Sequence, residues 1–107
     1  MNEDIDEITV EQTRIFKKAF DRLTEDQKDL VDKEIGEIIK NPEIGTRKKG
    51  DLQHLWVHKF RLTNQEVLLG YSWVESKFTL YLLNLGSHEN FYRDAKSRRQ
   101  ADLNFIK

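Results

Sequence analysis

A length of 107 residues predicts one domain, residues 1–107, and the absence of cysteine excludes disulfide bonds and thiolate metal sites. No apolar run approaches the roughly 20 residues that span a bilayer, and the first residues are acidic, so we expect a cytoplasmic protein without membrane contact. The net charge of −1 conceals an acidic half, with 13 Asp and Glu against 7 Lys and Arg in residues 1–44, and a basic half, with 6 against 11 in residues 45–107. A basic half on a nearly neutral protein indicates a local anionic partner.

The first part of the chain predicts a short strand and two helices. Residues 5–10 carry the aliphatic side chains of the strand, and residues 11–23 place apolar side chains at helical spacing. Thr24 and, three residues later, Gln27 match a capping box that opens a second helix. Pro42 ends this helix, because proline disfavours helical angles in the residue before it. The two helices are expected to form an antiparallel hairpin.

The second part has the character of a sheet. Residues 43–53 form a polar, basic loop, and three strand-like runs follow at 55–62, 66–73 and 78–85. The short connections between these runs are typical of hairpins. Residues 89–107 predict a last, basic helix with few apolar anchors. The expected class is α+β, with an N-terminal helix hairpin packed on one face of an antiparallel β-sheet and a C-terminal basic helix.

Alternation along residues 55–62 assigns the two faces of this strand. One face carries Trp56, His58, Phe60 and Leu62, and the other carries Leu55, Val57, Lys59 and Arg61. We expect the aromatic face to meet the helices and the other face to be open. Lys59 and Arg61 would then lie about 7 Å apart, a spacing suited to adjacent phosphate oxygens. An ordinary solvent-facing surface is the alternative interpretation.

His88 is the strongest candidate for proton transfer. The apolar run over residues 78–85 stops at Gly86, which can take the backbone angles of a sharp exit from a strand. His88 follows at the mouth of the sheet, and an imidazole with an unperturbed pKa of about 6.5 exchanges protons near neutral pH. Tyr92, four residues on, lies on the same side of the following helix. The alternative is a histidine that only hydrogen-bonds the turn.

Other basic residues extend this candidate site. Arg47, Lys48 and Lys49 of the basic loop and Arg93, Lys96, Arg98 and Arg99 of the last helix are expected to join Lys59 and Arg61 in one cationic tract suited to phosphate groups. Three histidines without cysteine give little support for a metal site. We therefore expect neither a metal nor another cofactor.

The order of these elements, with the stretch Gly-Ser-His-Glu-Asn-Phe-Tyr-Arg-Asp-Ala-Lys at residues 86–96, resembles the RelE/ParE superfamily of bacterial type II toxin–antitoxin toxins. The resemblance covers roughly residues 5–99. It implies an mRNA interferase, a metal-independent endoribonuclease that cuts mRNA on the ribosome and inhibits translation. It also implies that the cationic tract, with Arg47, Lys48, Lys49, Arg93 and Lys96, binds RNA. It also implies neutralisation by a cognate antitoxin protein.

Residue by residue, the resemblance places the strand lysine of the nucleases on Lys59 and their catalytic arginine or histidine on His88. It implies that His88 is a general acid or base, that Lys59 and Arg61 stabilise the phosphorane, and that Tyr92 orients the phosphate or stacks on a base. Glu66 is a candidate base, with an ordinary surface carboxylate as the alternative. Two departures stand out: Val57 and Glu66 occupy positions where RelE itself has a second lysine and an arginine.

Two other functions follow from the same resemblance. One is a ParE-like toxin that poisons DNA gyrase, for which no histidine is needed. The other is a toxin-fold protein without catalytic activity that binds only its antitoxin. Fold does not decide between them, because one fold supports different activities.

Overall fold

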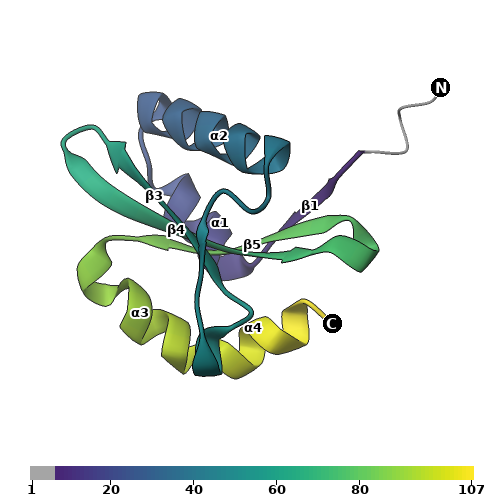
Figure 1. Ribbon diagram of the computed structural model, residues 1–107. Coiled ribbons are helices and arrows are strands. Elements are labelled where there is room, and N and C mark those ends of the chain that lie inside the picture. The colour runs from purple at the N-terminus through teal and green to yellow at the C-terminus, as the bar shows by residue number, and fades with distance from the viewer. Residues whose placement is uncertain (1–6) are drawn as a thin grey trace.

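The computed structural model describes residues 7–107, which form a five-stranded sheet between two helical layers (Figure 1). The strands are β1 (Thr9–Gln12), β2 (Thr46–Arg47), β3 (Trp56–Leu62), β4 (Gln65–Val74) and β5 (Thr79–Gly86). The helices are α1 (Arg14–Asp21), α2 (Glu25–Lys40), α3 (His88–Ser97) and α4 (Arg99–Phe105), with short helical turns η2 (Gly50–Leu52) and η3 (Glu75–Lys77). In this part of the chain, no helix combines the length and apolar character needed to cross a membrane.

The sheet has the order β1-β5-β4-β3-β2 and is mixed. Its centre is the predicted antiparallel meander β3-β4-β5, with β2 antiparallel to β3 at one edge. The other edge, β1, pairs in parallel with β5. The predicted α+β class is confirmed, with a parallel edge strand in addition. Residue 5, expected in the first strand, lies outside the described residues.

Thr13 links the edge strand to the first helix. Its side-chain oxygen accepts a hydrogen bond from the Phe16 N–H at 3.0 Å, which caps α1, and its hydroxyl donates to the Leu83 carbonyl at 2.8 Å. The helix therefore begins at residue 14 rather than 11, because residues 9–12 are already paired as β1. The predicted capping box of α2 is confirmed, with both reciprocal bonds between Thr24 and Gln27 present.

The face of the sheet under α1 and α2 has the predicted composition. Phe16 of α1 and Val31 and Ile38 of α2 are buried against the sheet. The alternate residues of β3, namely Trp56, Phe60 and Leu62, pack in the same cluster. The alternation read from the sequence is therefore confirmed on this face.

The expectation of an open second face is wrong, because α3 and α4 cover it (Figure 1). Phe91 and Ala95 of α3 are buried against Val57 and Leu68 of the sheet. Gly70 makes the close approach possible: a Cβ there would lie 2.8 Å from Cζ of Phe91. The C-terminal segment is thus two docked helices, with few but well-placed anchors.

Candidate functional site

A pocket of about 410 Å³ lies on the second face of the sheet, beside the start of α3. Its lining residues come from the β2 segment, from β3 and β4, and from the first turns of α3; they are Thr46, Lys48, Val57, Lys59, Leu68, His88 and Tyr92. Four of the residues singled out by the sequence, Lys48, Lys59, His88 and Tyr92, thus meet in one place. None of these lining residues is acidic.

The sheet supplies the floor of the pocket and one cation. Lys59 pairs with Leu68 across β3 and β4, and Val57 pairs with Thr46 of β2. Val57 and Leu68 are buried whereas Lys59 is exposed. An apolar floor beside a cation strengthens attraction for an anion, because less water screens the charge there.

Helix α3 supplies the opposite wall. Ser87 occupies the N-cap position and His88 is the first helical residue, so the predicted start near residue 89 is correct to one residue. The ring of Tyr92, one turn later, meets the His88 ring edge-to-face with centroids 5.6 Å apart. Phe91, seated in the gap at Gly70, anchors this turn against the sheet. His88 itself is exposed and free to meet a ligand from solution.

The basic loop brings Lys48 to the pocket. The loop is tied down at Tyr71, whose hydroxyl donates to the Pro42 carbonyl at 2.7 Å and accepts from the Gly45 N–H at 3.0 Å. Burial raises the pKa of Tyr71, so this hydroxyl stays protonated and able to donate. The Lys48 N–H then bonds the Leu55 carbonyl at 2.9 Å. Its ammonium group lies 5.0 Å from the centroid of the Tyr92 ring.

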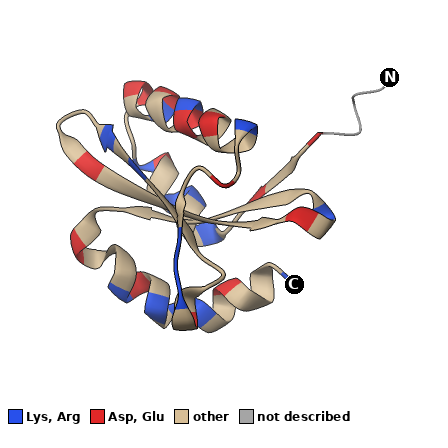
Figure 2. Cartoon of the chain, viewed as in Figure 1, with Lys and Arg blue, Asp and Glu red and all other residues tan. Residues whose placement is uncertain are grey.

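The pocket carries positive charge that the surrounding protein does not neutralise. Within residues 7–107, neither Lys48 nor Lys59 takes part in an ion pair. Figure 2 shows the basic loop as a blue strip that runs from the edge of the sheet toward the C-terminal helices. The arrangement can bind an anion and place it beside an imidazole.

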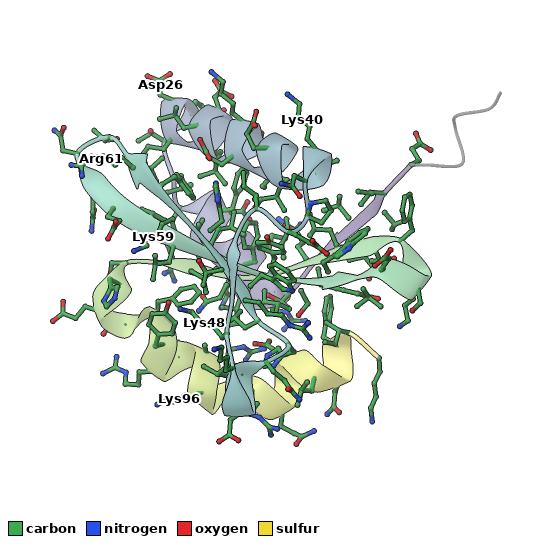
Figure 3. The ribbon with its side chains drawn as sticks, in the orientation of Figure 1. Asp26, Lys40, Lys48, Lys59, Arg61 and Lys96 are labelled. Carbon is green, nitrogen blue, oxygen red and sulfur yellow. The ribbon has the colours of Figure 1, made fainter. Side chains whose placement is uncertain are left out.

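Two predicted residues of the sheet lie outside the pocket. Arg61 and Glu66 face each other across the β3–β4 ladder, one alternate position further along than Lys59. Figure 3 shows Arg61 toward the tip of this hairpin, and its guanidinium donates to the Asn64 carbonyl at 3.2 Å. Neither residue lines the pocket.

The expected cationic tract is divided. Arg47 is turned to the other face of the sheet, where it lies over the ring of Trp56 at 5.8 Å. Lys49, Arg93 and Lys96 are exposed outside the pocket, and Figure 3 shows Lys96 on the outer side of α3. The last two arginines of the tract make internal contacts: Arg98 lies 3.9 Å from Asp102, and Arg99 donates to the Asp51 carbonyl at 2.7 Å.

The other two histidines lie outside the pocket and are half-buried. His58 is half-buried under α2, with Nε2 2.7 Å from Oε1 of Glu34. His54 is half-buried, and burial followed by the charge of Arg99 lowers its pKa. Among residues 7–107, no three His, Asp or Glu side chains are grouped to hold a metal ion.

The sequence alone does not show that Arg47 and Lys48 lie on different faces of the sheet, because a two-residue strand carries almost no pattern. Alternation is the signal that could reveal it: in an extended segment, Thr46 and Lys48 share one side and Arg47 and Lys49 share the other.

Comparison with known proteins gives one family and one fold. A family model described as ParE-like toxin of type II bacterial toxin–antitoxin system matches residues 10–96. No match was found among curated proteins.

Several solved structures share the fold. A free-state mutant of the Escherichia coli toxin RelE is 18% identical, with a TM-score of 0.68 over 85% of this chain and 96% of that chain. A chain of the intact E. coli RelBE toxin–antitoxin complex is 16% identical, with a TM-score of 0.63 over 76% of this chain and 96% of that chain. A conserved hypothetical protein of Helicobacter pylori is 22% identical, with a TM-score of 0.51 over 78% of this chain and 97% of that chain. Identities this low show a common fold.

Proposed function

We propose that this chain, which belongs to the ParE-like toxins of type II bacterial toxin–antitoxin systems, is a metal-independent endoribonuclease that cleaves mRNA on the ribosome and so inhibits translation. The observation that carries the proposal is the pocket, where an exposed imidazole, His88, lies beside unneutralised lysines above an apolar floor. Such a site suits a reaction in which a phosphate gains charge while protons move.

The chemistry uses the RNA as its own nucleophile. The ribose 2′-oxygen forms a bond to the adjacent phosphorus, the bond to the 5′-oxygen breaks, and a 2′,3′-cyclic phosphate and a 5′-hydroxyl result. The 2′-hydroxyl loses a proton and the leaving oxygen gains one, so a general base and a general acid are needed. His88 fills one of these proton-transfer roles. Lys59 stabilises the charge that develops on the phosphorane.

Residues around the pocket would hold the flanking nucleotides. Arg61 follows Lys59 by two positions on the same side of β3, about 7 Å along the strand, and suits an adjacent phosphate. Lys49, Arg93 and Lys96 are exposed outside the pocket and would add positive charge for more distant phosphates. Glu66 lies opposite Arg61 and does not line the pocket, so we do not propose it as the base.

The order in which cellular syntheses stop tests this function. Induction of the protein should halt incorporation of labelled amino acids before incorporation of labelled thymidine, because the proposed target is mRNA on the ribosome. Unimpaired growth would instead identify a toxin-fold protein without catalytic activity.

A toxin directed at DNA gyrase is the second candidate. The description of the matching family as ParE-like favours it. It predicts the opposite order, with thymidine incorporation failing first.

We also propose a cognate antitoxin as partner. The E. coli RelBE structure is that of a toxin–antitoxin complex, and one of its chains shares this fold. On this chain, an acidic segment that folds on binding would replace phosphates with carboxylates over the pocket. Association with the antitoxin should slow as salt rises, since steering is screened over about 8–10 Å. Changing Lys48 and Lys49 together to Glu should slow association more than it speeds dissociation; an association rate indifferent to both changes would place the antitoxin elsewhere.

A further inference from the structure

Among the described residues, the central strands β3, β4 and β5 bring one cation to the pocket. Lys59 projects from β3, whereas the preceding residue on the same side, Val57, is apolar and buried in the floor. A phosphate that gains negative charge during the reaction is best held by more than one donor. The structure therefore raises the question of which group supplies the second charge.

Lys48 has the right position. It lines the same pocket as Lys59 but arrives from the β2 segment, on the far side of Val57. Its backbone is fixed by the N–H bond to Leu55, and its side chain is half-buried. Because it has no ion pair within residues 7–107, its charge is available to a ligand.

Tyr92 holds this lysine in place. The ammonium group of Lys48 lies over the Tyr92 ring, 5.0 Å from its centroid, and the negative face of an aromatic ring attracts a cation. The ring is itself fixed by edge contacts with His88 and Phe91. With Lys48 over it, this face of the ring is not open for stacking on a base.

We infer, on the basis of the proposed nuclease function, that Lys48 is the second phosphate-binding cation of the site and that Tyr92 is a positioning residue that acts through it. Lys48 thereby supplies from the loop the charge that Val57 cannot supply from the strand. The Tyr92 ring carries the function of that residue, and its hydroxyl does not take part.

A binding experiment tests the phosphate contact without cleavage. The probe is a single-stranded deoxytrinucleotide, which lacks the 2′-hydroxyl and cannot react. Its dissociation constant is measured by NMR titration at several salt concentrations. Lys48→Gln should weaken binding and reduce the slope of log affinity against log salt by about 0.7, the value for one phosphate contact on a single strand. Lys33→Gln, which removes a charge from the opposite helical layer, should leave the slope unchanged.

The role of Tyr92 is tested by two variants and their combination. Tyr92→Leu removes the ring and should reproduce the smaller salt slope of Lys48→Gln, whereas Tyr92→Phe keeps the ring and should restore the wild-type slope. On programmed ribosomes, Lys48→Gln should slow cleavage by about 100-fold. The double variant Lys48→Gln with Tyr92→Leu should be no slower than Lys48→Gln alone.

Several results would overturn the inference. These are a wild-type protein that does not bind the probe, an unchanged slope in Lys48→Gln, a Tyr92→Phe variant as impaired as Tyr92→Leu, or additive losses in the double variant. Failure of the nuclease proposal looks different: the slopes would change as stated while no variant, nor the wild-type protein, cuts mRNA. Cleavage that is insensitive to Lys48→Gln would overturn the role of Lys48 and leave the nuclease proposal standing.

Discussion

Both faces of the sheet carry an apolar core, but they differ toward the C-terminal end of β3. Under α1 and α2, the alternate residues Trp56, Phe60 and Leu62 of β3 pack in the apolar cluster, and His58 between them is paired with Glu34 of α2. Under α3, the core includes Val57 and then gives way to Lys59 and Arg61, which are exposed. Both faces carry helices, and on the second the exposed Lys59 of β3 lies beside the start of α3.

This difference separates the parts that hold the fold from the parts that we propose meet a ligand. The first face is covered by α1 and the longer helix α2, and Trp56, Phe60 and Leu62 of β3 pack beneath them. The second face is covered by short helices, and the start of α3 borders the pocket lined by Lys48, Lys59 and His88. Changes to buried residues of the first face should therefore affect stability alone, whereas changes to the buried residues that hold the start of α3 should affect stability and function together.

A matched pair of phenylalanines gives the largest expected effect. Phe16 and Phe91 are each 1% exposed, one on each face. Replacing either with Ala should lower the free energy of unfolding by about 3–5 kcal/mol through loss of packing and a cavity. Only Phe91→Ala should also reduce cleavage per folded molecule, because it frees the turn that holds His88 and Tyr92. Urea unfolding measures the loss of stability, and the cleavage rate is measured at a temperature where both variants are folded. Equal cleavage rates for the two variants would contradict the proposed distinction between the faces.

A buried acid makes the second face sensitive to pH. Asp102 of α4 is 3% exposed, and burial raises its pKa to about 6, while the charge of Arg98 acts to lower it. Because this pKa is above the ordinary value of 3.8, the contribution of Asp102 to stability is fully present below about pH 4 and is lost as the pH rises through 6.

Asp102→Asn should accordingly be more stable than the wild-type protein at pH 7.5, by up to about 3 kcal/mol, and nearly equal to it at pH 4. Urea unfolding at both pH values measures the difference. Amide exchange in α4 should slow in the variant at pH 7.5. A stability difference that does not depend on pH would show that ionisation of this side chain is not what opposes folding.

The smallest effect on stability and cleavage is expected from loss of the Tyr71 hydrogen bonds that hold the basic loop. Tyr71→Phe removes the hydroxyl that bonds Pro42 and Gly45, at a cost of about 1–2 kcal/mol. Cleavage should fall several-fold, because Lys48 is then less firmly placed. Tyr81→Phe is the control: this ring is also buried, and its hydroxyl makes no hydrogen bond within residues 7–107. Equal cleavage by the two variants would show that the hydrogen bonds of the loop do not affect the function of the pocket.

The features predicted well from the sequence depend on neighbours in the chain. The capping box needs only Thr24 and Gln27, three residues apart, and the faces of β3 follow from alternation. The position of His88 likewise follows from a strand that stops at Gly86 and a helix that begins directly after it.

The features that were missed depend on residues far apart in the chain. The docking of α3 needs the absence of a side chain at Gly70 to admit Phe91, which apolar spacing in residues 89–107 does not reveal. The division of the basic loop depends on the register of β2 against β3, which turns Arg47 toward Trp56 and leaves Lys48 beside the pocket. A pair of residues carries too short a pattern to predict such a register.

Cleavage by His88→Ala tests the central claim most directly. Purified protein is added to ribosomes programmed with mRNA, and the rate of cleavage is compared with that of the wild-type protein. His88 is exposed, so the variant should keep its melting temperature while cleavage falls roughly 100- to 10,000-fold, the range for loss of an acid–base group. Unchanged cleavage by a normally folded variant would contradict the account and reduce His88 to the first residue of a helix.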